Sequence, residues 1–321
     1  MIPASIDEAQ QLLREARGTV GFVGGGTEAA RPRVDLPIET AKLDRIVEYA
    51  PSDQVVTAEC GVRLSVLQRE LARNGQRLAL DPARPEQATL GGIVAANSYG
   101  PLRTRYGSVR DLIIGVSVIR ADGTRAKGGG KVVKTVAGFD LPKLMCGSWG
   151  TLGMIATVTF RVHPLPEASA TVVARGLDAA GVNELVSAVR RLQVEPAAMM
   201  AVRRESYEVW IRFEGFRAGV EQQRGKMRDL ADATWPSGEP AGNVRFGALP
   251  TQLPQVEQAL GGGFCWYPTL GLGLAAVSSP DNRRFAAFGG WIGSPPPSSP
   301  ELHQAVKSRL DPDARLPRLS Q

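Results

Sequence analysis

The sequence is poor in the residues that bind metals and build disulfide frameworks. Its 321 residues include two histidines, His163 and His303, and three cysteines, Cys60, Cys146 and Cys265. The cysteine count is odd and no CxxC pair occurs, so we expect no zinc site and no iron–sulfur cluster held by this chain alone. We interpret the three cysteines as buried, reduced thiols of a reducing compartment.

The chain also lacks a long apolar run and a basic cluster. No stretch reaches the roughly 18 consecutive apolar residues that span a bilayer, and residues 1–4 (MIPA) do not open a signal peptide. The net charge of +6 is dispersed, without a run of five Lys or Arg, so nucleic acid is not an expected partner. We expect a cytoplasmic protein without a membrane span, and one that reaches the inner membrane only through partners.

Glycine is abundant, and it recurs in ordered motifs. Gly24-Gly25-Gly26-Thr27-Glu28 follows a short β-rich run, and Ala88-Thr89-Leu90-Gly91-Gly92 lies about 65 residues later. Backbone N–H groups of the first loop can form an anion-binding nest, and Thr89 offers a hydroxyl for phosphate. The alternatives are a tight turn for the first loop and a glycine turn opening a packed helix for the second. Two such loops favour one diphosphate held between them.

The first loop also fits a dinucleotide-binding pattern, which we reject. The pattern GxGxxA ends at Ala29, and Asp44 lies where a ribose-binding acid would sit. A Rossmann loop, however, opens a helix whose N-terminus holds the pyrophosphate. Pro32 and Pro37 would lie inside that helix, where proline costs about 3 kcal/mol or more. We therefore expect the loop to lead into extended structure.

Two further segments complete the glycine-rich region. Arg105–Asp111 mixes charged and aromatic residues, and Gly147–Gly153 contains three glycines. We interpret Arg110 and Asp111 as supports of a cofactor pocket; the alternative is a surface loop with an Arg–Asp pair.

The pattern changes after Pro164 and Pro166, where we place the first domain boundary. Strands and helices then alternate in a β-α-β-β-α order, which is typical of a ferredoxin-like α+β unit. No internal repeat is recognised. The expected elements of this part are strands at 171–174, 199–203 and 207–213 and helices at 178–192 and 218–233, with a last helix at 301–310.

These motifs, in this order, resemble the FAD-binding domain of the vanillyl-alcohol-oxidase-type flavoproteins, the PCMH-type fold. Val132–Met145 and Gly147–Gly153 more narrowly resemble the smaller, FAD-binding subunit of bacterial glycolate oxidases. The end of the last helix, Leu310-Asp311-Pro312, fits that family too, but Leu316-Pro317-Arg318 replaces its usual Asn-Pro-Gly-Arg. The implied fold is α+β, with a two-part PCMH-type FAD-binding domain (1–166), a smaller ferredoxin-like α+β cap (167–300) and a C-terminal helix and tail (301–321).

The resemblance implies FAD, extended with its pyrophosphate between the two glycine loops. Some relatives attach the flavin covalently to His or Cys. No histidine lies in residues 1–162 and Cys60 follows a strand rather than a glycine loop, so we expect non-covalent FAD. The residues that the resemblance places at the cofactor are Gly24, Gly25, Gly26, Thr27, Glu28, Thr89, Gly91, Gly92, Ala96, Asn97, Gly100, Tyr106, Gly107, Arg110, Asp111, Gly150, Thr151, Gly153 and Ile155.

The implied reaction is oxidation of a small 2-hydroxy acid, glycolate or D-lactate, to the 2-oxo acid, with electrons leaving through FAD. The implied partners are a larger flavin subunit and an iron–sulfur subunit. Related dehydrogenases carry a His-rich metal site in the second domain, which this chain lacks, and we interpret both histidines as structural. The catalytic residues stay unassigned; Arg103, Arg105 and Arg212 are candidate anchors for a substrate carboxylate.

Three alternatives stay open at this point. The chain is an accessory flavin or assembly subunit without a complete substrate site, or an assembly subunit without flavin. The third is an NADPH-dependent reductase of a cell-wall precursor, an enolpyruvyl sugar nucleotide, because this FAD fold also serves that reaction. Val136–Leu141 and Gly147–Gly153 argue against the reductase.

Overall fold

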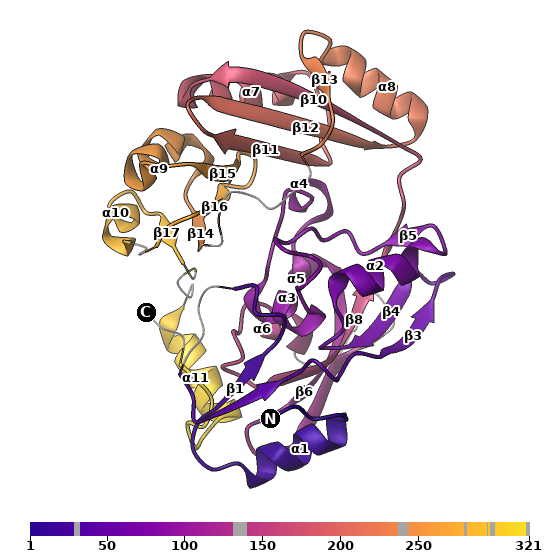
Figure 1. Ribbon diagram of the computed structural model, residues 1–321, viewed down its shortest axis with the longest axis vertical. Helices are drawn as coiled ribbons and strands as arrows, with labels where there is room; N and C mark the ends of the chain where they lie inside the picture. Colours follow the sequence, from indigo (N-terminus) through magenta and orange to yellow (C-terminus); the bar gives the residue numbers. More distant parts are fainter. Residues whose placement is uncertain are drawn as a thin grey trace. The chain divides into compact units, whose positions relative to one another are not determined.

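The computed structural model describes residues 1–28, 33–130, 140–236, 242, 244–278, 281–293, 295 and 299–318. Residues 132–139 of the family motif lie outside this part. The chain divides into two compact units, both of mixed helices and strands (Figure 1). None of the described helices is long and apolar enough to cross a membrane. The first unit comprises Met1–Tyr99, Gly107–Leu165 and Pro297–Gln321, and the second comprises Gly100–Tyr106 and Pro166–Pro296.

An antiparallel five-stranded sheet, in the order β3-β4-β8-β6-β7, forms the centre of the first unit. Its middle strand β8 is buried along most of its length, because β4 and β6 flank it and helices α3 and α6 pack on the sheet. Helix α5 contacts α3. The strands are β3 (Ile46–Ala50), β4 (Val55–Glu59), β6 (Ile113–Ile119), β7 (Arg125–Gly129) and β8 (Met154–Arg161), and the helices are α3 (Leu90–Ala96), α5 (Val109–Leu112) and α6 (Leu141–Met145).

A parallel two-stranded sheet, β1 (Val20–Val23) with β2 (Leu36–Glu39), forms the smaller part of the first unit. The N–H of Val20 donates to the carbonyl of Arg315 at 2.7 Å, so the tail after the last helix lies against β1 (Figure 1). The remaining elements of this unit are α1 (Ile6–Glu15), α2 (Leu64–Ala72), β5 (Gln76–Arg77), β9 (His163–Pro164) and α11 (Pro300–Leu310).

Local residue patterns in this unit predict a helix capped by Ser65 and a strand at 78–80, and both predictions are wrong. Helix α2 begins at Leu64 with Ser65 buried inside it, and Arg63 occupies the N-cap without a side-chain hydrogen bond. No strand forms at 78–80 in this described segment, where the Gln68 side chain takes both the N–H and the carbonyl of Leu78.

The second unit contains an eight-stranded antiparallel sheet, in the order β13-β10-β12-β11-β15-β16-β14-β17. Its first half has the predicted β-α-β-β-α order and adds a fourth strand, β13, where the sequence predicted the end of a helix. The elements of this half are β10 (Ala168–Leu177), α7 (Ala179–Arg191), β11 (Ala198–Arg203), β12 (Tyr207–Gly215), α8 (Arg217–Lys226) and β13 (Ala231–Ala233).

The second half repeats the topology of the first, which the sequence did not reveal. In each half the order from the outer edge inward is fourth, first, third and second strand, and the two second strands, β11 and β15, join the halves. The repeat is structural and its strands are short, so no sequence period marks it. The second half consists of β14 (Val244–Gly247), η1 (Pro250–Gln252), α9 (Leu253–Leu260), β15 (Phe264–Tyr267), β16 (Leu272–Ala275), α10 (Asn282–Ala286) and β17 (Trp291–Ile292).

Candidate functional site

The two glycine loops predicted from the sequence touch each other in the first unit. The N–H of Gly25 donates to Thr89 Oγ1 at 3.3 Å. A Cβ on Gly24 would overlap the same Oγ1, and a Cβ on Gly25 would overlap the carbonyl oxygen of Gln87. Glycine is therefore required at both positions, because any side chain would force the loops apart.

Thr89 links the two loops and caps helix α3. Its Oγ1 also accepts the N–H of Gly92 at 3.4 Å. The N–H groups of Leu90 and Gly91 donate to carbonyls of segment 60–62 at 2.9 and 2.7 Å, so the start of α3 is satisfied within the protein. A threonine hydroxyl that accepts two hydrogen bonds still has its own hydrogen to donate. The second loop can thus offer a ligand this hydroxyl rather than backbone N–H groups.

The first loop leads from β1 into β2, and the described residues between them contain no helix, as predicted. Gly26 has a φ of +67°. Within the described part of the chain, no acceptor is found for the N–H groups of Gly26 and Thr27. Successive backbone donors of this kind can bind an anion. Glu28 closes the loop on its other side, because its Oε1 accepts the hydroxyl of Ser98 at 2.6 Å.

A third loop, Gly147–Gly153, is bonded to the C-terminal end of α3. The N–H of Gly147 donates to Val94 O at 3.0 Å, and the N–H of Trp149 donates to Ala95 O at 2.9 Å. A Cβ on Gly150, where φ is +73°, would lie 3.1 Å from the ring of Phe22, which shortly precedes the first loop. All three loops therefore meet around α3 and the end of β1.

The third loop contains a polar group that the sequence prediction missed. Ser148 is 3% exposed, and its Oγ has no hydrogen-bond partner in the described structure. The predicted site residue Thr151 uses its own hydroxyl locally, as a donor to Ser148 O at 2.6 Å. Ile155 is buried in β8 opposite Val118. The signal for Ser148 was its position inside the glycine motif.

Other predicted cofactor residues shape the backbone around these loops. Asn97 ends α3 in the left-handed region, directly after Ala96. Asp111 Oδ2 accepts both the N–H and the hydroxyl of Ser108, at 2.7 and 2.8 Å, and so closes the turn that starts at Gly107 (φ +81°). Arg110 is exposed on the short helix α5.

Gly100, Tyr106 and the arginine candidates belong to the second unit. Arg103, Arg105 and Tyr106 lie on the four-residue helix α4 (Arg103–Tyr106), which contacts β11. Arg105 Nη1 donates to the carbonyl of Glu214, and the Tyr106 hydroxyl donates to Glu214 Oε2 at 3.4 Å. The two predicted groups therefore converge on a glutamate that sequence reasoning did not single out.

Arg212, the third candidate, also contacts Glu214. Its Nε lies 3.0 Å from Glu214 Oε1, and Glu214 is 4% exposed. The guanidinium carbon lies 4.6 Å from the centroid of the Trp235 ring. The guanidinium of Arg212, which was predicted to anchor a substrate carboxylate, is thus paired with a carboxylate of the chain itself.

The titratable thiols and metal ligands add no further centre to the described residues. No group of three or more His, Cys, Asp or Glu side chains in the described ranges could hold a metal ion. The three cysteines are free. Burial raises the pKa of the Cys60, Cys146 and Cys265 thiols to about 12.

One family model and several known proteins are similar to this chain. A family model described as an FAD binding domain matches residues 1–129. The glycolate oxidase subunit GlcE of Escherichia coli (strain K12) is 31% identical over 96% of this chain and 91% of its own length. GlcD of Bacillus subtilis (strain 168) is 33% identical, but the match covers 61% of this chain and 43% of GlcD. The mitochondrial cytochrome-type D-lactate dehydrogenase of Arabidopsis thaliana is 30% identical over 54% of this chain and 31% of its own length.

The solved structures agree on the fold. Alkyldihydroxyacetonephosphate synthase superimposes with a TM-score of 0.75, over 98% of this chain and 74% of its own, at 15% sequence identity. At that identity the likeness shows the fold alone. It confirms the α+β, PCMH-type fold that the motif order predicted.

Proposed function

The chain belongs to the family of the glycolate oxidase subunit GlcE, and from this membership we propose that it is the smaller flavin subunit of a complex that oxidises glycolate or D-lactate to the 2-oxo acid. The observation that carries the proposal is the extent of the relationship, which covers nearly the whole length of both chains. At the level of the family, the chain is an FAD-dependent oxidoreductase that acts on hydroxy acids. The proposed partners are a larger flavin subunit similar to GlcD and an iron–sulfur subunit.

The residues of the first unit fit FAD. The N–H groups of Gly26 and Thr27 and the hydroxyl of Thr89 are donors suited to a diphosphate, and the loops leave no room for side chains at Gly24 and Gly25. The buried Ser148 hydroxyl offers one more polar contact. When bound, FAD accepts the hydride from the substrate carbon, while the protein supplies binding and orientation. We propose that these three loops hold it without a covalent bond.

One observation favours a second function, that of an accessory flavin subunit. Arg105 and Arg212 both contact Glu214, and the Glu214 carboxylate neutralises Arg212. A substrate carboxylate would have to compete with that side chain, because the Glu214 carboxylate already balances the charge of Arg212. In this case the chain binds FAD, and the larger flavin subunit contributes the substrate site.

Anaerobic spectroscopy of the purified chain tests both functions. We expect flavin absorbance in the isolated chain. Bleaching by glycolate or D-lactate would support catalysis by this chain alone, and bleaching only after the larger flavin subunit is added would support the accessory function. Reduction by NADPH in place of a hydroxy acid would contradict both. A colourless chain that also fails to take up added FAD would overturn the flavin assignment.

A further inference from the structure

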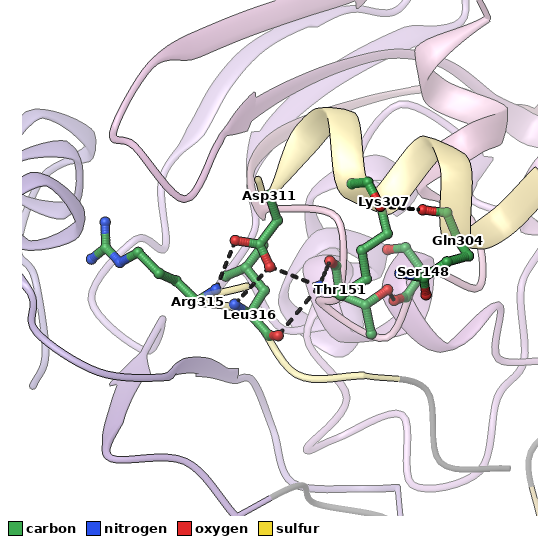
Figure 2. Close-up of polar contacts among 8 residues, drawn as sticks. Ser148, Thr151, Gln304, Lys307, Asp311, Arg315 and Leu316 are labelled. Carbon is green, nitrogen blue, oxygen red and sulfur yellow. Dashed lines mark hydrogen bonds and ion pairs between the residues drawn. The ribbon is translucent and has the colours of Figure 1, made fainter. Parts of the chain in front are cut away.

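Helix α11 carries a buried lysine that reaches one of the proposed cofactor loops. Lys307 is 4% exposed, and its Nζ donates to Thr151 O at 3.0 Å, to Asp311 Oδ2 at 2.8 Å and to Leu316 O at 3.2 Å (Figure 2). An ammonium group has three donors, so every one of them is used. Two partners lie in the same C-terminal tail, whereas Thr151 lies 156 residues away in the sequence.

Asp311 fixes the tail around this lysine. Its Oδ1 accepts the N–H of Arg315 at 2.8 Å, and its Oδ2 accepts the N–H of Leu316 at 2.9 Å (Figure 2). Asp311 is 3% exposed. Removing a charged pair from water is costly, and such a pair is stable only when further hydrogen bonds satisfy it. The bonds from the tail and from the third loop meet that requirement together.

The contact between Lys307 and Thr151 does more than fix the tail, because it also reaches the third loop. The carbonyl that Lys307 holds belongs to the residue whose hydroxyl donates to Ser148 O, and Ser148 carries the buried hydroxyl without a partner in the described structure. Figure 2 shows Thr151 with its two partners, Lys307 and Ser148. Displacement of Thr151 would therefore move Ser148 as well.

We propose that Lys307 is a positioning residue for the cofactor: it holds loop Gly147–Gly153 in the conformation that receives FAD. The inference rests on the proposed function, because it assigns the loop to the cofactor site. Helix α11 then supports the FAD site through Lys307, although the tail that follows it lacks the family's usual Asn-Pro-Gly-Arg sequence.

The test compares Lys307→Met with Arg315→Met in the full chain. Arg315 lies on the same tail and also donates to carbonyls, but to those of Leu13, Ala16 and Ala121, none of which belongs to the loop. We expect Lys307→Met to speed amide hydrogen exchange in residues 147–153 of the FAD-free protein. We also expect it to weaken FAD binding about tenfold, the change that ~1.4 kcal/mol produces. Arg315→Met should speed exchange at the end of α1 and leave the Kd for FAD within about twofold.

Several outcomes decide the inference. Unchanged exchange and an unchanged Kd in Lys307→Met would overturn it, as would an equal loss of FAD affinity in Arg315→Met, since the tail would then act through general stability. Where Lys307→Met does not fold, Asp311→Asn takes its place and should show the same pattern to a smaller degree; no change there overturns the proposal. Absence of FAD binding by the wild-type chain defeats the proposed function instead, and the exchange data still report on the Lys307 contact.

Discussion

The segments that carry the predicted site residues satisfy their polar groups differently in the two units. In the first unit, the N–H of Gly25 donates to the hydroxyl of Thr89, N–H groups of the third loop donate to carbonyls of α3, and glycine lets the loops approach. In the second unit, the side chains of Arg212 and Tyr106 both reach the Glu214 carboxylate. The first arrangement leaves N–H and hydroxyl donors for a ligand, whereas the second uses its charges internally. We therefore expect FAD affinity to depend on the first unit's loops and to be insensitive to the second unit's ion pairs.

The largest expected loss of FAD affinity follows from Gly25→Ala. The new Cβ would overlap the carbonyl oxygen of Gln87, a backbone atom that cannot rotate away. The loops must then separate, and we expect FAD affinity to fall at least about a hundredfold, with a stability loss of about 1–3 kcal/mol from overpacking. Fluorescence titration of the FAD-free protein measures the affinity, and thermal unfolding measures the stability.

Gly130→Ala is the control for that experiment. A Cβ there meets no atom of the described residues within 4 Å, although Gly130 lies in the same unit. Its Kd for FAD should stay at the wild-type value. Equal affinity of both variants would mean that contact between the loops does not build the cofactor site.

Thr89→Val should have an intermediate effect. Valine keeps the shape of threonine but removes the oxygen that accepts the N–H groups of Gly25 and Gly92. Loss of the helix cap costs about 1 kcal/mol, and we expect FAD affinity to fall about tenfold because the donor hydroxyl is lost as well. Ser5→Ala removes the matching cap of α1, where Ser5 Oγ accepts the N–H of Glu8. It should cost similar stability and leave FAD binding unchanged, so parallel losses in both variants would argue against a cofactor role for Thr89.

Glu214→Gln tests the comparison in the second unit. It removes the charge that faces Arg212 in this ion pair, and leaving that mostly buried guanidinium without its counter-charge costs about 1–3 kcal/mol or more. We expect thermal unfolding at a lower temperature, with a Kd for FAD within about twofold of wild type. Glu208→Gln, on the same strand, alters a more exposed pair with Arg175 and should change stability by less than about 1 kcal/mol. A large loss of FAD affinity in Glu214→Gln would show that the second unit also controls the flavin.

Sequence reasoning located what depends on backbone and failed for what depends on side-chain packing. The glycine motifs and the strands expected at 199–203 and 207–213 follow from residue type and alternation, and these signals are local. The strands of the duplicated half, residues 244–292, are only two to four residues long, which is too short to give a periodic signal in the sequence. Likewise, nothing near Lys307 in the sequence points to Thr151, because their contact depends on how α11 packs. Glu214 was missed for the same reason.

The smallest expected effect on FAD binding concerns the thiols of Cys60 and Cys265. Cys60 lies in the first unit and Cys265 in the second, and both are fully buried. Burial raises the pKa of Cys60 in the first unit and of Cys265 in the second to about 12. Roughly one thiol in ten thousand is then ionised at pH 8, and only the thiolate is a nucleophile. We expect neither unit to react with iodoacetamide at pH 8 while folded, and all flavin to leave the protein on denaturation.

The raised pKa values of these thiols determine whether the protein gains or loses stability as the pH rises. An unfolded cysteine ionises near pH 8.5, whereas the folded protein keeps these thiols protonated up to about pH 12. Between those values the unfolded chain binds fewer protons, so the thiols' contribution to stability is complete below about pH 8.5 and declines as pH rises. Chemical unfolding at pH 7 and pH 10, with Cys60→Ala and Cys265→Ala compared with wild type, checks this. If either alanine variant loses as much stability as wild type between those pH values, that thiol is not the titrating group. A cysteine-linked flavin surviving denaturation would contradict non-covalent binding in the first unit.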